Sequence, residues 1–159
     1  MKAKLRSLAL SASTFRFRDF STFFKMQSFK NNGTRVVLTG FMGVGKSSVG
    51  RHLAMLLGCE RIDLDTFIKD SERRKIHDII DADGLDSYRA IESKNLKQIL
   101  NDGRAQIISL GGGAWIEEKN RKLLKKNGLT SVWLESTFQH CWRNIRMSKK
   151  ERPLARNKI

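Results

Sequence analysis

Lys46 and Ser47 end the stretch that carries the clearest chemical signal in the sequence. Residues 40–47 read Gly-Phe-Met-Gly-Val-Gly-Lys-Ser and fit G-x-x-x-x-G-K-[ST], the pattern of the phosphate-binding P-loop. In such a loop the backbone N–H groups point at one anion, the lysine reaches the β- and γ-phosphates, and the serine hydroxyl ligates Mg²⁺. The alternative is a glycine-rich turn followed by chance by Lys-Ser.

The elements around this loop are the ones that the chemistry requires. Residues 36–39 are a short apolar run rich in β-branched side chains, which predicts a buried strand. After the loop, apolar residues recur at helical spacing as far as Leu57, and Gly58 is suited to end the helix. A loop that leaves a strand and opens a helix places an anion at the positive end of the helix dipole. This context favours a P-loop over a simple turn.

Two aspartates follow this helix. Residues 60–65 read as a second short strand, and alternation along a strand puts Asp63 and Asp65 on the same side. Two carboxylates at the end of a strand beside a P-loop are well placed for Mg²⁺ and for a substrate hydroxyl. A solvated acidic turn is the competing interpretation.

A basic and an acidic residue lie three apart in the next region. Residues 66–101 are predicted to be mostly helical with a break near Gly84, and Arg89 and Glu92 meet on the helix surface. The pair is either an ordinary intrahelical ion pair, or Glu92 orients Arg89 to hold an anionic substrate as a bidentate fork.

Three consecutive glycines come directly after the third predicted strand, residues 106–110. Three glycines in a row are unfavourable in conformational entropy, so they indicate close backbone approach to a ligand. The place fits, because open α/β sheets bind substrates at the carboxyl ends of their strands. A flexible turn is the alternative. The remaining predicted elements are helices over residues 117–126 and 138–145 and a fourth strand over residues 131–134.

The composition is that of one soluble globular domain with basic ends. The chain has 159 residues, 40% hydrophobic and 30% charged, and a net charge of +15. No apolar run approaches the roughly 20 residues of a membrane span. Residues 1–30 and 141–159 each carry seven Lys or Arg residues and one acid, a local charge of +6 apiece. Such ends could bind nucleic acid non-specifically. For the C-terminal end we favour a lid that brings an arginine onto a transferring phosphate.

The first 30 residues are expected to be a disordered basic extension, with the folded domain spanning 31–159. Translation starting at Met26 is favoured, and an organelle-targeting leader within residues 1–25 is the alternative, because the segment is poor in acids and contains Ser and Arg. Cys59 and Cys141 have no metal or redox spacing and are expected to be reduced thiols in a cytoplasmic protein.

Five motifs together resemble one family. G-F-M-G-V-G-K-S-S-V-G, I-D-L-D, Y-R-A-I-E, L-G-G-G-A and R-P-L-A occur in the order and at the separations of shikimate kinase, over residues 34–157. The resemblance implies an α/β P-loop NTPase fold, a parallel sheet flanked by helices, with family strand order 2-3-1-4-5. It also implies transfer of the ATP γ-phosphate to the 3-hydroxyl of shikimate, with Mg²⁺, in aromatic amino acid biosynthesis.

The resemblance also implies roles for individual residues. Mg²⁺ is expected on Ser47 and Asp63, the latter through water. Asp65 is the candidate base, and Lys46 and Arg152 supply positive charge. The residues implied to bind ATP are Gly43, Val44, Gly45, Lys46, Ser47, Ser48, Arg143 and Arg152. Those implied to bind shikimate are Asp65, Arg89, Gly111, Gly112 and Gly113, with Glu92 supporting Arg89.

The sequence departs from the family in two places. The family usually has Glu where Leu85 stands, which could loosen the hold on Arg89. The chain stops at Ile159, inside the expected lid, so we expect a truncated member with sheet order 2-3-1-4, no fifth strand, low stability and weak or no turnover.

The expected partner is shikimate, with a monomeric chain, no membrane and no specific nucleic acid. The alternatives are another small-molecule P-loop kinase, of the gluconate or nucleoside monophosphate type, and a non-catalytic nucleotide-binding or basic nucleic-acid-binding protein.

Overall fold

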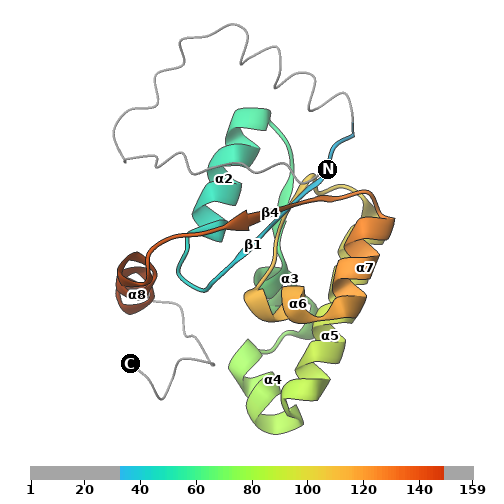
Figure 1. Cartoon of the computed structure of the whole chain (residues 1–159). Coiled ribbons are helices and arrows are strands. Elements are labelled where there is room, and N and C mark those ends of the chain that lie inside the picture. The colour runs from blue at the N-terminus through green and yellow to red at the C-terminus, as the bar shows by residue number, and fades with distance from the viewer. Residues whose placement is uncertain (1–32, 149–159) are drawn as a thin grey trace, which may run out of the picture.

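The computed structural model describes residues 33–148, which form a parallel four-stranded sheet with helices on both faces (Figure 1). The strand order is β2-β3-β1-β4, which confirms the predicted order 2-3-1-4. β1 pairs with β3 from Val36 opposite Ile107, and with β4 from Val36 opposite Thr130. The strands are β1 (Val36–Gly40), β2 (Arg61–Asp63), β3 (Ile107–Ser109) and β4 (Thr130–Leu134).

The helices follow the strands in alternation, as expected for parallel pairing through crossover connections. Their bounds are α2 (Lys46–Leu57), α3 (Leu64–Glu72), α4 (Ile76–Asp83), α5 (Leu85–Asp102), α6 (Gly112–Ile116), α7 (Glu118–Lys126) and α8 (Phe138–Met147). Figure 1 shows α2 on one side of the sheet, α3, α5, α6 and α7 on the other, and α8 apart from both groups. None of the helices between residues 33 and 148 is long and apolar enough to cross a membrane.

Two apolar clusters hold these layers together. Val36 and Leu38 of β1 pack with Leu57 on the α2 side, whereas Val37 belongs to the larger cluster beneath α3, α4, α5 and α7. All five residues of β1 are buried. Burial on both faces explains the continuous apolar run in this strand, and it fixes the point from which the P-loop leaves the sheet.

The second strand is shorter than predicted, and Asp65 is not part of it. β2 ends at Asp63, which is extended and N-caps α3 because its side chain accepts a hydrogen bond from the N–H of Thr66 at 3.3 Å. Asp65 therefore lies in the first helical turn, where an acidic side chain is favoured by the helix dipole. The prediction that Asp63 and Asp65 alternate along one strand was wrong.

The glycine stretch forms a helix start. Gly111 is extended and caps α6, which begins at Gly112, so neither a flexible turn nor an open loop is present. The predicted break at Gly84 is confirmed, because this residue ends α4 and precedes α5 with a φ of 85°. The expectations for residues 1–30 and for the lid with Arg152 lie outside the described residues.

Candidate active site

The P-loop connects the buried end of β1 to α2. Gly43 has a φ of 78°, and a Cβ there would collide with the backbone carbonyl of Cys141 in α8, so only glycine fits. Lys46 folds across the loop and its Nζ donates to the carbonyls of Gly40 at 2.8 Å and Phe41 at 2.9 Å. Of the other residues predicted here, Val44 is buried and Ser48 is exposed in the first turn of α2.

Ser47 and Asp63 come together although 16 residues separate them. The Ser47 hydroxyl donates to Oδ2 of Asp63 at 2.8 Å, so the start of α2 and the end of β2 present two oxygens side by side. This pair suits Mg²⁺, which prefers oxygen ligands and retains several waters. Among residues 33–148 no three His, Cys, Asp or Glu residues cluster as metal ligands, so other ligands would come from phosphate and water.

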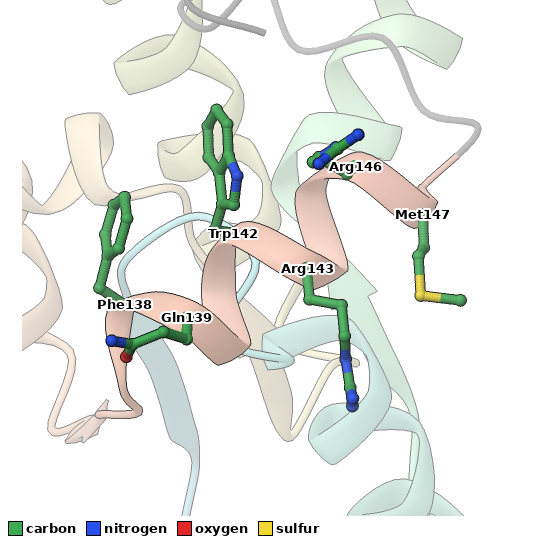
Figure 2. Close-up of a pocket in the computed structure, with 6 residues that line it drawn as sticks. All are labelled: Phe138, Gln139, Trp142, Arg143, Arg146 and Met147. Atoms are coloured by element: carbon green, nitrogen blue, oxygen red, sulfur yellow. The ribbon is translucent and has the colours of Figure 1, made fainter.

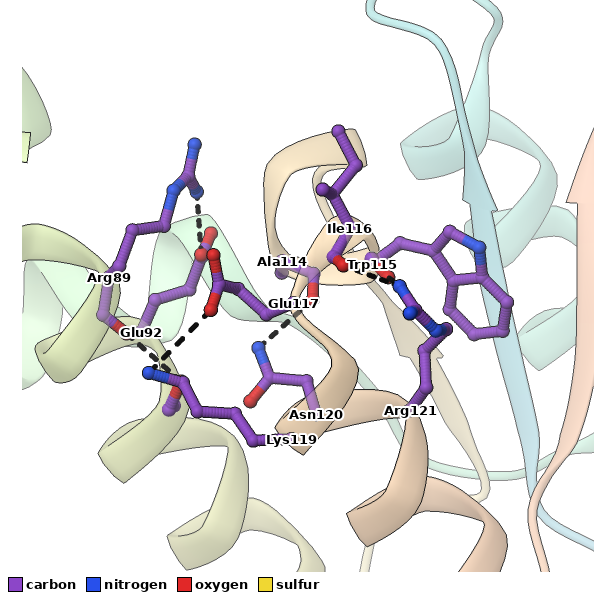
Figure 3. Close-up of polar contacts among 10 residues, drawn as sticks. Arg89, Glu92, Ala114, Trp115, Ile116, Glu117, Lys119, Asn120 and Arg121 are labelled. Atoms are coloured by element: carbon purple, nitrogen blue, oxygen red, sulfur yellow. Dashed lines mark hydrogen bonds and ion pairs between the residues drawn. The ribbon is translucent and has the colours of Figure 1, made fainter. Parts of the chain in front are cut away.

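The predicted substrate residues gather around α6. A Cβ added to Gly113 would overlap the guanidinium of Arg89, and one on Gly111 would lie 3.7 Å from Oδ1 of Asp65. Arg89 in turn donates through Nη1 to Oε2 of Glu92 at 2.6 Å (Figure 3). Glu92 is only 1% exposed. The ion pair is therefore intrahelical, and it also orients Arg89 against the glycine backbone.

The electrostatics place a second carboxylate near this pair. Burial raises the pKa of Glu92, and the hydrogen bond and charge of Arg89 oppose this rise while the charge of Asp65 adds to it. Burial also raises the pKa of Tyr88 well above its ordinary value, and the charge of Asp65 is the next largest cause of that rise. The negative charge of Asp65 thus acts on two side chains of α5, Tyr88 and Glu92.

The P-loop and the glycine stretch meet at the carbonyl of Gly40. This oxygen accepts from Lys46 at 2.8 Å, and a Cβ built on Gly112 would lie 3.6 Å from it. The glycine stretch is therefore next to the P-loop, at the edge of the sheet where open α/β folds bind ligands.

Helix α8 shows a contact that the sequence did not predict. Asn144 donates from Nδ2 to the carbonyl of Gly43 at 2.8 Å. The neighbouring Arg143, which was expected to face the nucleotide, is exposed. It lines an open pocket of about 440 Å³ on α8 with Phe138, Gln139, Trp142, Arg146 and Met147 (Figure 2). An isolated asparagine carries no motif, so its contact could be found only in three dimensions.

The fold and the site define the class of protein. A parallel sheet of this order with a P-loop between its central strand and a helix is the P-loop NTPase fold. Asp65 and Arg89 lie beside the glycine stretch next to that loop, and a carboxylate and an arginine are groups suited to bind a small anionic molecule with hydroxyls.

Comparison with known proteins identifies the family. The family profile described as Shikimate kinase matches residues 42–159. The shikimate kinase of Streptococcus thermophilus is 45% identical over 122 residues, which are 76% of this chain and 72% of that protein. The enzyme of Rhizobium meliloti is 37% identical over 119 residues, which are 75% of this chain and 60% of that protein. This chain belongs to the shikimate kinase family, whose members are phosphotransferases that use ATP and act on a shikimate hydroxyl.

Solved structures agree with this assignment. Shikimate kinase from Bacteroides thetaiotaomicron superposes with a TM-score of 0.72 at 28% identity, over 79% of this chain and 70% of that one. The enzyme from Acinetobacter baumannii, solved in complex with shikimate, superposes with a TM-score of 0.68 at 31% identity, over 75% of this chain and 66% of that one. The chain thus spans between 60% and 72% of the length of the four relatives named here.

Proposed function

We propose that this chain transfers the γ-phosphate of ATP to the 3-hydroxyl of shikimate. The observation that carries the proposal is the meeting of Lys46 and Gly112 at the carbonyl of Gly40, because it brings a phosphate loop beside a platform lined by Asp65 and Arg89. Phosphoryl transfer needs positioning and charge neutralisation more than covalent chemistry.

On the substrate side, each residue has a distinct task. Arg89, oriented by Glu92, grips the shikimate carboxylate as a fork. Asp65 binds the ring hydroxyls and accepts the proton of the attacking oxygen, as a general base within reach of it would. The backbone of Gly111, Gly112 and Gly113 lies close to the ring, where side chains would intrude.

On the nucleotide side, the N–H groups of residues 43–48 surround the phosphates, and Lys46 swings from its carbonyl partners to the β- and γ-oxygens. Mg²⁺, when held by Ser47 and, through water, by Asp63, would neutralise charge on the β- and γ-phosphates. Arg143 and Arg152 are assigned to the nucleotide, Arg152 from a lid outside the described residues.

The test is shikimate-dependent ADP release by the full 159-residue chain, measured with a coupled assay beside calorimetric binding of shikimate. Asp65→Asn is expected to keep shikimate binding and to lower turnover by about 100-fold or more, and EDTA should abolish turnover in the parent chain. A chain that fails to bind shikimate, whether or not it binds ATP, would overturn the proposal. So would ADP release with gluconate or a nucleoside monophosphate in place of shikimate.

We also propose how the chain is divided into a folded domain and an extension. Residues 31–159 form the kinase domain, and residues 1–30 are a basic extension. We expect a cytoplasmic monomer without specific nucleic acid or membrane partners, with targeting by residues 1–25 as the alternative. Light scattering of the purified chain and the intact mass of the native protein check the oligomeric state and the extension.

A further inference from the structure

The helix that carries the glycine platform is too short to be stable alone. α6 has five residues, fewer than an isolated helix needs, because nucleation is unfavourable and few hydrogen bonds follow it. Its C-terminal carbonyls have no partner further along the same helix. The position of Gly112 and Gly113 therefore depends on contacts from elsewhere in the fold.

Those contacts come from two adjacent residues of α7. Asn120, which is 1% exposed, donates from Nδ2 to the carbonyl of Ala114 at 2.9 Å. Arg121 donates from Nη1 to the carbonyl of Trp115 at 2.8 Å and also to that of Ile116. Figure 3 shows both side chains turned toward the last turn of α6. Three consecutive carbonyls at the end of this helix are thus held by side chains of the next one.

The opposite end of α6 faces the substrate residues. The N–H of Trp115 bonds the carbonyl of Gly111 at 3.3 Å, so the two ends belong to one hydrogen-bonded turn. Gly113 abuts the guanidinium of Arg89, and Gly111 lies beside the carboxylate of Asp65. A shift of the turn would move both glycines relative to these groups, without any change in the P-loop.

We propose that Asn120 and Arg121 are positioning residues for the substrate half of the site, acting through α6. The proposal rests on the proposed function for its ligand, shikimate, but the pinning of α6 can be tested without any ligand. Neither residue touches the substrate in this scheme. Their variants should therefore separate shikimate binding from nucleotide binding.

The first test is hydrogen exchange of the full chain without ligand. In Arg121→Ala and Asn120→Leu, amides of residues 110–117 should exchange about tenfold faster, because the carbonyls at the end of α6 lose their side-chain donors. Protection in α5 and α2 should stay as in the parent chain. Arg121→Ala keeps the test usable if Asn120→Leu does not fold, since Arg121 is only partly buried. Unchanged exchange in this segment of a folded Arg121→Ala variant would overturn the pinning.

The second test is calorimetric affinity for shikimate and for ADP. Both variants should bind shikimate about tenfold more weakly and ADP within twofold of the parent, and Arg121→Lys should recover part of the loss. Lys122→Ala is the matched control, because it removes only the surface pair with Glu118 at 2.9 Å and should change neither affinity. Equal losses for ADP and shikimate would show a general structural effect and reject the positioning role. A parent chain that binds no shikimate would instead reject the proposed function, while hydrogen exchange still decides the pinning.

Discussion

Replacing Gly113 with alanine should weaken shikimate binding through Arg89. Gly113 lies in α6 and does not have a positive φ, so alanine fits the backbone and even gains about 1 kcal/mol in helix propensity. The obstacle is steric, since the new Cβ would overlap Cζ, Nη1 and Nη2 of Arg89. Because the guanidinium is the far end of a flexible side chain, it should shift while it keeps its bond to Glu92, and the fold should stay intact.

The size of the effect follows from the bonds that the displaced guanidinium loses. A hydrogen bond to a charged group contributes about 1.5–3 kcal/mol. If the shift of Arg89 removes one of two bonds to the substrate carboxylate, the loss is about 2 kcal/mol, or roughly 30-fold in Kd. ADP affinity should not change, because the P-loop is untouched.

A double-mutant cycle tests this reasoning. Shikimate affinity is measured by NMR titration, which reaches weak binding, for the parent, Gly113→Ala, Arg89→Ala and the double variant. The alanine should lower affinity about 30-fold in the parent and by less than twofold once Arg89 is gone, since coupled residues are non-additive. The same loss in both backgrounds would mean that the methyl group obstructs shikimate directly, and would refute the explanation.

Three further predictions follow from single contacts. Asn144→Leu removes the bond to Gly43 and should raise the Kd of ADP about fivefold to tenfold, as measured by calorimetry. The control is Asn127→Leu, which loses a bond of similar length on an exposed surface. An equal effect of the two substitutions would contradict the prediction. Arg35→Met leaves two carbonyls near the end of α5 and that of Ala105 after it without their donor. It should lower the free energy of unfolding in urea by about 1–2 kcal/mol, and an unchanged value would count against this. Burial raises the pKa of Glu92 above its ordinary value of 4.5. The ionisation of Glu92 therefore destabilises the fold increasingly as the pH rises from 4.5 through the raised pKa. The stability of Glu92→Gln relative to the parent should therefore improve over that interval in urea unfolding, and parallel pH profiles would disprove this.

The parts that followed from the sequence depend on short-range signals. The apolar run at residues 36–39 leads into a glycine loop, and Lys46 opens a helix in the structure as predicted. Gly58 ends that helix in a left-handed conformation, which its lack of a Cβ allows. The order of the strands then followed from the family resemblance and is confirmed.

The parts that were missed depend on capping and on distant contacts. Asp63 fits a strand by pattern, but its side chain caps the next helix, and a three-residue strand has too few positions to show a period. The same ambiguity hid the helix that starts at Gly112. The bond from Asn144 to Gly43 joins residues 101 positions apart, and no local pattern marks such a partner.

The departure at Leu85 can now be weighed against the geometry around Arg89. Leu85 is 44% exposed at the start of α5, whereas Glu92, one turn beyond Arg89, is almost fully buried. A buried carboxylate is strongly destabilising without a partner. Moving the Arg89 guanidinium away from Glu92, which it contacts at 2.6 Å, would therefore be unfavourable. Gly113 blocks movement on another side of that group. Arg89 is therefore preorganised by one buried acid and one backbone surface, and neither of these contacts involves the side chain at position 85.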